Sequence, residues 1–176
     1  IPYLSTTGEL KTKPTQHSVK TLLEIGIQPD ILLCRSEQSI SKDIKSKIGL
    51  FCNIETDSVM QALDAKSIYE VPLMLKKEKF DEVVLEKLNL RASPPKLSVW
   101  KKVVSKITDP EREITIGICG KYNIIPDAYK SITESFIHAG AYNGVKVNLQ
   151  WIDSEEIEKN KSGLSQVLGK VCGVLV

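Results

Sequence analysis

The sequence has few histidines and aromatic residues and no long apolar run. Its 176 residues include two histidines, and 6% of them are aromatic. No apolar stretch approaches the roughly 20 residues that a membrane-spanning helix needs. The 24 basic and 22 acidic side chains leave a net charge of +2, without the basic excess that is typical of nucleic-acid-binding domains. We therefore expect neither a nucleic acid nor a membrane as a partner.

Cysteine is scarce and has no motif spacing. Cys34, Cys52, Cys119 and Cys172 form no C-x-x-C pair, and each lies among apolar neighbours. This pattern predicts reduced thiols that act as small core residues, in a reducing and therefore cytoplasmic compartment. A zinc site built from scattered cysteines and two distant histidines is not expected, so we predict no metal site.

Neither end of the sequence has the pattern of a natural terminus. The chain begins at Ile1 without an initiator methionine or a signal-peptide pattern. It ends on residues 173–176, an apolar stretch that is typical of the middle of a strand. The hydrophobic fraction of 41% is that of a globular protein. We therefore expect a globular piece of a longer protein.

Apolar spacing alternates between helical and extended patterns. A helix is predicted over 15–25, ended by Gly26 in a left-handed conformation. A continuous apolar run over 30–34 predicts a strand that is buried on both faces. The next predicted elements are a helix over 41–48 capped by Ser41, strands over 49–53 and 68–71, and helices over 57–63 and 73–88.

The second half of the chain alternates more regularly. A stretch with a Pro pair and no apolar period, 91–96, predicts a linker. The elements predicted after it are a helix over 98–107, strands over 114–120, 145–152 and 171–176, and helices over 126–141 and from Asp153 onward. Strands that alternate with helices at this spacing predict an α/β fold built from parallel-sheet units with right-handed crossovers.

The densest polar cluster lies between Gly8 and His17. It combines Lys11 and Lys13 with two threonines, Gln16 and the start of a helix. Free N–H groups and the positive end of the helix dipole favour an anion there, and lysines suit a polyphosphate. A solvated basic loop that only caps a helix is the alternative, and the residue pattern leaves both open.

Motifs for other chemistries are missing. The sequence contains no Walker phosphate loop and no nucleophile elbow. Gly117 and Gly120 supply part of a dinucleotide fingerprint, for which a tight turn is the simpler interpretation. Cys172 lies in an apolar run that predicts a buried, unreactive thiol. Paired carboxylates such as Asp81 and Glu82 are predicted to be solvated surface.

One string of residues is far more specific than these patterns. The segment Gly8–Lys20, GELKTKPTQHSVK, closely resembles the CTP synthase family. Further stretches that match the family lie at 26–30, 34–36, 47–48, 50–53, 67–69, Gly117 with 120–122, 126–131 and 151–154. The resemblance thus extends over nearly the whole chain.

The resemblance implies a reaction and a domain order. CTP synthases aminate UTP to CTP: ATP phosphorylates O4 of the uracil, and ammonia made from glutamine displaces the phosphate. By resemblance, 1–90 is the C-terminal part of a P-loop-type synthetase (amidoligase) domain and 91–112 is an interdomain linker. Residues 113–176 then begin a flavodoxin-like class I glutamine amidotransferase domain.

The resemblance also assigns binding residues. Those that match the UTP site, which also takes CTP as a feedback inhibitor, are Lys11, Thr12, Lys13, Pro14, Thr15, Gln16 and Lys47. Those that match the contact with the ATP adenine, through their backbone, are Leu63, Asp64 and Ala65. Lys121 and Tyr122 match a motif near the domain interface and receive no catalytic role. The family is tetrameric, and neighbouring subunits complete its UTP site.

The resemblance places the reacting groups outside this sequence. The family's phosphate loop, its ligands for the Mg²⁺ that accompanies ATP, and its glutaminase nucleophile have no match here, so we assign no catalytic residue. The chain alone is expected to be inactive. Two alternatives stay open: a non-catalytic truncated paralogue that serves assembly or regulation, and a flavodoxin-like cofactor binder on 113–176.

Overall fold

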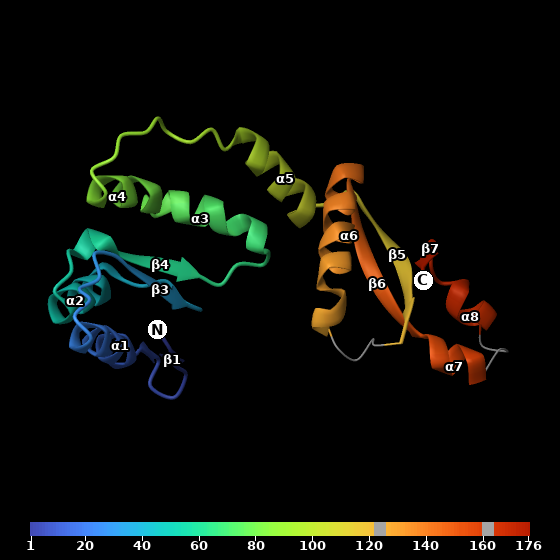
Figure 1. Cartoon of the computed structure of the whole chain (residues 1–176), viewed down its shortest axis with the longest axis horizontal. Coiled ribbons are helices and arrows are strands. Elements are labelled where there is room, and N and C mark those ends of the chain that lie inside the picture. Colours follow the sequence, from blue (N-terminus) through green and yellow to red (C-terminus); the bar gives the residue numbers. More distant parts are fainter. Residues whose placement is uncertain (122–125, 160–163) are drawn as a thin grey trace. The chain divides into compact units, whose positions relative to one another are not determined.

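The computed structural model describes residues 1–121, 126–159 and 164–176. They form two compact units, Ile1–Lys96 and Leu97–Val176. Each unit contains parallel strands and helices, which confirms the predicted α/β class (Figure 1). Within the described ranges, no helix is long and apolar enough to cross a membrane.

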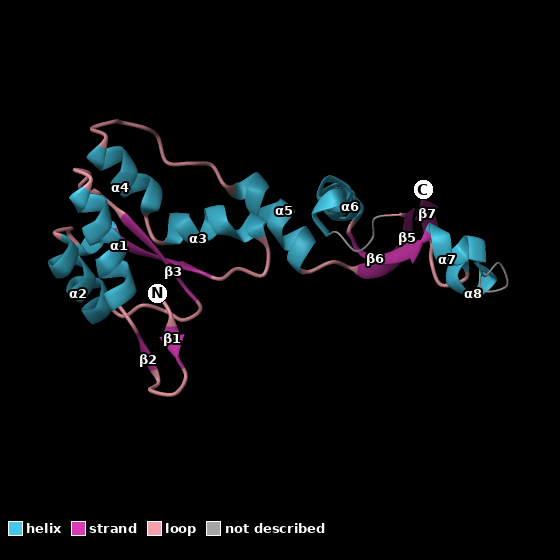
Figure 2. Cartoon of the chain, turned by 60° about the horizontal axis from the view of Figure 1, so that its bottom comes forward, coloured by secondary structure: helices cyan, strands magenta, loops and turns pink. Residues whose placement is uncertain are grey.

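The first unit opens with a short hairpin that leads into a helix. Strands β1 (Tyr3–Leu4) and β2 (Glu9–Leu10) pair antiparallel (Figure 2). Helix α1 (Lys13–Glu24) follows two residues later and begins before the predicted position. Gly26, at φ 85°, takes the left-handed conformation that was predicted for the end of this helix.

Two parallel strands carry the core of this unit. In β3 (Leu32–Ser36) and β4 (Val59–Leu63), Leu32 pairs with Val59 and Ser36 pairs with Leu63. Alternate side chains of each strand point to opposite faces. The buried side chains that pack α1 and α2 (Lys42–Cys52) against one face are Val19, Cys34, Ile40, Ile48, Cys52 and Val59.

The predicted strand over 49–53 is wrong, because α2 continues through Cys52. Ile48 and Cys52 are both buried at helical spacing, whereas Leu50 and Phe51 are 81% and 64% exposed. A Cβ at Gly49 would lie 2.6 Å from the carbonyl oxygen of Ile54. A glycine there therefore lets the chain return closely beside the helix. The cap of α2 at Ser41 is confirmed, since its side chain accepts from the N–H of Ile44.

The predictions for 57–63 and 68–71 are exchanged in the structure. The first segment is a 3₁₀ turn, η1 (Thr56–Ser58), followed by strand β4. The second is η2 (Ile68–Glu70), which leads directly into helix α3 (Val71–Lys77). Ser67 and Glu70 form a capping box that starts this turn, and Pro72 takes the first turn of α3 instead of ending a strand.

The predicted helix over 73–88 is two helices. Lys79, at φ 60°, separates α3 from α4 (Phe80–Lys87). Helices α1 and α2 lie on one side of the β3–β4 pair, and α3 and α4 lie on the other (Figure 1). Unit 1 is therefore a layered α/β/α arrangement.

The second unit is a three-stranded parallel sheet with helices. Its elements are α5 (Ser98–Thr108), β5 (Arg112–Gly120), η3 (Pro126–Tyr129), α6 (Lys130–Asn143), β6 (Val145–Asp153), α7 (Ser154–Lys159), α8 (Leu164–Leu168) and β7 (Gly173–Leu175). The strand order is β6-β5-β7, and both pairings are parallel. The strands and helices predicted for this half are thus confirmed, with shifted ends.

The four cysteines, all within the described ranges, are free thiols. Cys34 and Cys52 are buried, and burial raises the pKa of both thiols. Cys119 is partly buried. The predicted burial of Cys172 is wrong: it precedes β7 and is exposed, although its N–H donates to the carbonyl of Thr115 at 2.7 Å.

Candidate functional site

The predicted anion loop is the junction between β2 and α1. Thr12 immediately precedes the helix and is only 7% exposed. Its Oγ1 accepts a hydrogen bond from Nε2 of Gln16 at 3.1 Å, and its carbonyl accepts from the N–H of Gln16 at 3.1 Å. These two bonds hold the Gln16 amide beside the N-terminus of α1.

The first turn of α1 keeps its backbone donors available. Among the described residues, no side chain caps this end of the helix. Pro14 has no N–H, and the first turn carries no acidic side chain. The positive end of the helix dipole is therefore left uncompensated by the chain, beside the N–H groups of Lys13 and Thr15.

Three lysines supply positive charge around this turn. Lys13 is exposed, and Lys11 is half-buried and pairs with Glu9. The hydrogen bond and charge of Lys11 lower the pKa of Glu9, and the charge of the exposed Lys47 on α2 lowers it further. Lys47 thus acts on the same carboxylate as Lys11, although 36 positions separate them in sequence. The structure brings the two predicted parts of the site into one neighbourhood.

A second set of predicted residues lies at the end of β4. Leu63, Asp64 and Ala65 line a pocket of about 630 Å³, which is the size of a small-ligand site. Arg35 of β3 pairs with Asp64 at 3.1 Å, and both side chains are exposed. The other wall is apolar and comes from α3, with Val71, Met74 and Leu75. The carboxyl ends of parallel strands are the usual ligand edge of an open α/β sheet.

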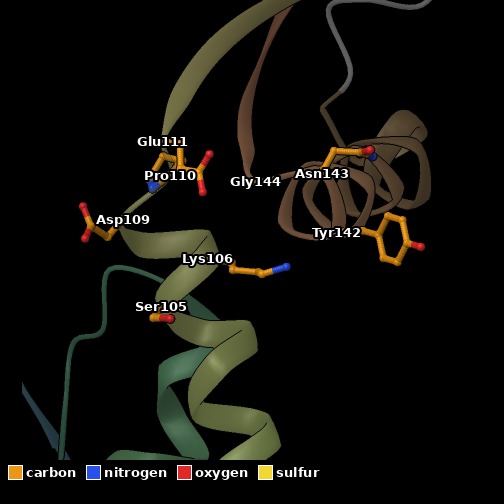
Figure 3. Close-up of a pocket in the computed structure, with 8 residues that line it drawn as sticks. All are labelled: Ser105, Lys106, Asp109, Pro110, Glu111, Tyr142, Asn143 and Gly144. Atoms are coloured by element: carbon orange, nitrogen blue, oxygen red, sulfur yellow. The ribbon is translucent and has the colours of Figure 1, made fainter.

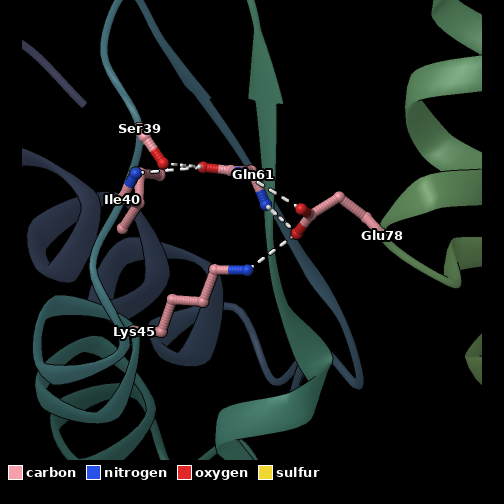
Figure 4. Close-up of polar contacts among 5 residues, drawn as sticks. All are labelled: Ser39, Ile40, Lys45, Gln61 and Glu78. Carbon is pink, nitrogen blue, oxygen red and sulfur yellow. Dashed lines mark hydrogen bonds and ion pairs between the residues drawn. The ribbon is translucent and has the colours of Figure 1, made fainter.

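One polar cluster of unit 1 was not predicted from the sequence. Glu78 accepts hydrogen bonds from both Lys45 and Gln61, next to a pocket of about 590 Å³ that Lys45 and Glu78 help to line (Figure 4). Lys45 and Glu78 are 33 positions apart and belong to no motif. The only sequence signal is that Lys45 lies two residues before Lys47 and so on another face of α2.

Unit 2 carries a smaller polar pocket of about 320 Å³ (Figure 3). Lys106 of α5, Glu111 and Tyr142 contribute to its lining. Glu111 immediately precedes β5, and Gly144 immediately precedes β6, so this pocket lies at the amino ends of the strands. That edge is opposite to the usual ligand edge.

The structure gives no binding role to the motif residue Lys121. Lys121 makes an exposed ion pair with Glu155 at 3.2 Å, and Tyr122 lies outside the described residues. The described part of the chain contains no group of three or more metal-ligating side chains.

Comparison with known proteins identifies the family. A family model described as "CTP synthase N-terminus" matches residues 1–90. The protein named CTP synthase from Chloroherpeton thalassium is 54% identical over 178 residues, which cover 100% of this chain and 32% of the relative. Its namesake from Methanococcus maripaludis is 58% identical over 158 residues, 90% of this chain and 30% of the relative.

The chain spans about a third of the length of these curated relatives. A third protein of that name, from Methanocaldococcus jannaschii, is 54% identical over 161 residues, covering 92% of this chain and 30% of its own length. The predicted resemblance is confirmed. Because the family model covers 90 residues of 176, the chain belongs to the CTP synthase family.

Proposed function

We propose that the chain is part of an enzyme that aminates UTP to CTP with ATP and with ammonia from glutamine. Its own share is a nucleotide-binding surface at the start of α1. The observation that carries the proposal is the uncapped first turn of α1, with Lys11 and Lys13 at its entrance and Lys47 nearby. A polyanion at this turn gains from the ammonium groups and from the helix dipole together.

The lysines, the backbone and Gln16 have different tasks in this proposal. Lys11, Lys13 and Lys47 attract the triphosphate, and the N–H groups of the first turn hydrogen bond to its oxygens. Because Nε2 of Gln16 donates to Thr12, its Oε1 is left to accept from the uracil or ribose. Thr15 completes the turn. CTP shares the triphosphate and ribose, so the same loop serves feedback inhibition.

The pocket at the end of β4 is the proposed adenine site. The adenine lies between the end of β4 and the apolar wall of α3. The backbone of Leu63, Asp64 and Ala65 hydrogen bonds to its polar atoms. ATP is accompanied by Mg²⁺, which would neutralise phosphate charge. We propose that its ligands lie outside this chain.

We propose the domain assignment on similar grounds. Residues 1–90 belong to a P-loop-type synthetase domain, 91–112 to the linker, and 113–176 to a flavodoxin-like glutaminase domain. The order β6-β5-β7 corresponds to the 2-1-3 order in which flavodoxin-like sheets begin, and this supports the last assignment. The complete enzyme is proposed to be a cytoplasmic tetramer whose subunits share the UTP site.

The test is Lys13→Ala in the full-length protein, with UTP half-saturation measured at saturating ATP and ammonia. Loss of one charge-assisted contact with phosphate predicts an increase of about tenfold. The matched control is Lys20→Ala, which removes an exposed lysine further along α1. An unchanged value for Lys13→Ala would remove the loop from substrate binding.

A further inference from the structure

The unpredicted cluster beside β4 is centred on the Glu78 carboxylate. Oε2 of Glu78 accepts from Nζ of Lys45 at 2.7 Å and from the N–H of Gln61 at 3.4 Å. Oε1 of Glu78 accepts from Nε2 of Gln61 at 2.9 Å. Oε1 of Gln61 in turn accepts from the N–H of Ile40 at 3.0 Å and from Oγ of Ser39 at 3.3 Å. We call these five residues the polar bridge (Figure 4).

The ion pair of the polar bridge is largely shielded from water. Lys45 is 21% exposed and Glu78 is 18% exposed. Burial opposes ionisation of Glu78, but hydrogen bonds from Lys45 and Gln61 outweigh it, so the pKa of this carboxyl lies below its ordinary value. A half-buried, multiply bonded pair fixes geometry more firmly than an exposed pair does.

The polar bridge joins the two helical layers around the edge of β4. Lys45 comes from α2 on one side of the strands, and Glu78 comes from the end of α3 on the other side (Figure 4). Gln61 is the middle residue of β4, and its backbone N–H and its side-chain amide both donate to Glu78. One carboxylate therefore sets the positions of α2, β4 and α3 together.

The same three elements carry Lys47 of the proposed UTP site and the proposed adenine pocket. Helix α2 presents Lys47 two residues after Lys45. Strand β4 runs from Gln61 directly into Leu63, and α3 supplies the apolar wall of the adenine pocket. A shift of Glu78 would thus move Lys47 relative to the α1 turn and move α3 relative to the end of β4.

We propose that Lys45 and Glu78 are positioning residues for both nucleotides. Their ion pair fixes the position of Lys47 in the proposed UTP site relative to the adenine pocket on the other side of β4. This inference rests on the proposed function. Neither residue contacts a nucleotide in the proposed sites. Displacements of an ångström in binding groups cost up to about a hundredfold in activity, so both half-saturation constants are expected to respond.

The test uses Lys45→Met and Glu78→Gln in the full-length protein, with KM for UTP, KM for ATP and kcat measured separately. We expect both KM values to rise together by about tenfold in each variant, with a smaller change in kcat. Lys45→Arg keeps a cation at this position and should retain most of the affinity. A merely structural role would reduce the folded fraction and hence the apparent kcat, but not KM.

The matched control is Lys76→Met. Lys76 pairs with Asp81 at 3.0 Å and with Glu82 at 2.8 Å, within the α3–α4 segment alone. Its removal should leave both KM values unchanged. Unchanged KM values in Lys45→Met and Glu78→Gln, or a rise for only one nucleotide, would overturn the inference. If Lys13→Ala also has no effect, the proposed function fails as well; if Lys13→Ala alone raises KM for UTP, only the inference fails.

Discussion

Lys45 and Lys47 lie on one turn of α2 and have opposite surroundings. Lys45 is 21% exposed, and its partner carboxylate receives donors from two residues. Lys47 is exposed, and its charge acts on Glu9 of β2, which is half exposed and bound chiefly by Lys11. The comparison teaches that shielding decides the role of a lysine. A shielded pair organises the fold, whereas an exposed lysine near an uncapped helix start remains available to a ligand.

The largest expected effect follows from removing positive charge at the exposed start of α1. The double variant Lys11→Ala/Lys13→Ala should raise UTP half-saturation about a hundredfold, because two charge-assisted contacts with phosphate are lost. The loss should shrink as salt concentration increases, since salt screens exposed charges. Steady-state kinetics at two ionic strengths would measure both. An effect equal to that of the Lys20→Ala control would contradict the assignment.

The stabilisation that the shielded Lys45–Glu78 pair provides should depend on pH rather than on salt. Glu78 has a lowered pKa in the folded state, so it stabilises the fold above its ordinary pKa of about 4.3. This contribution is lost as the pH falls through the folded pKa. Glu78→Gln should cost about 1–3 kcal/mol at neutral pH and progressively less in acid. Thermal unfolding of the full-length protein between pH 7 and pH 3 would test this; a difference from wild type that stays constant over that range would count against it.

The close approach at Gly49 tests the packing that supports both lysines. Gly49→Ala places a methyl group against the carbonyl oxygen of Ile54, at 2.6 Å before relaxation. Overpacking of this kind costs about 1–3 kcal/mol. The expected result is a lower thermal midpoint, with KM for UTP raised because the end of α2 shifts. Gly26→Ala is not a suitable control, since Gly26 has a positive φ; Ser46→Ala on the exposed face of α2 is. Equal midpoints for Gly49→Ala and Ser46→Ala would show that the contact is not restrictive.

The smallest effect is expected at Glu9. In the proposed site its carboxylate would compete with phosphate for Lys11, so Glu9→Gln should lower UTP half-saturation about two- to threefold, because exposed ion pairs are weak. Glu24→Gln, at the far end of α1, is the matched control. The change should vanish at high salt. Weaker UTP binding in Glu9→Gln would mean that Glu9 supports the site instead of competing with it.

The sequence predicted the start of α1 better than it predicted the polar bridge. The α1 turn is built from consecutive residues, Lys11–Gln16, so its lysines, proline and helix start are visible as one string. The α/β class and the parallel strands of unit 2 follow from alternating apolar patterns. The polar bridge depends on Gln61 and Glu78, which long-range folding brings together and which no local pattern marks.

The wrong predictions of secondary structure between residues 49 and 71 have a common physical cause. Short apolar runs are compatible with a helix or a strand, and tertiary packing decides between them. Val59 and Met60 are adjacent and both buried, which suits a strand covered on two faces. The capping box at Ser67 was a local signal that could have corrected the reading of 68–71.

The central claim is that a triphosphate binds at the start of α1. The most direct measurement is a crystal structure of the full-length protein soaked with UTP. The account predicts phosphate oxygens within hydrogen-bond distance of the Lys13 ammonium and of the N–H of Thr15. UTP bound elsewhere, with this turn of the helix open in an enzyme that is otherwise competent, would contradict it.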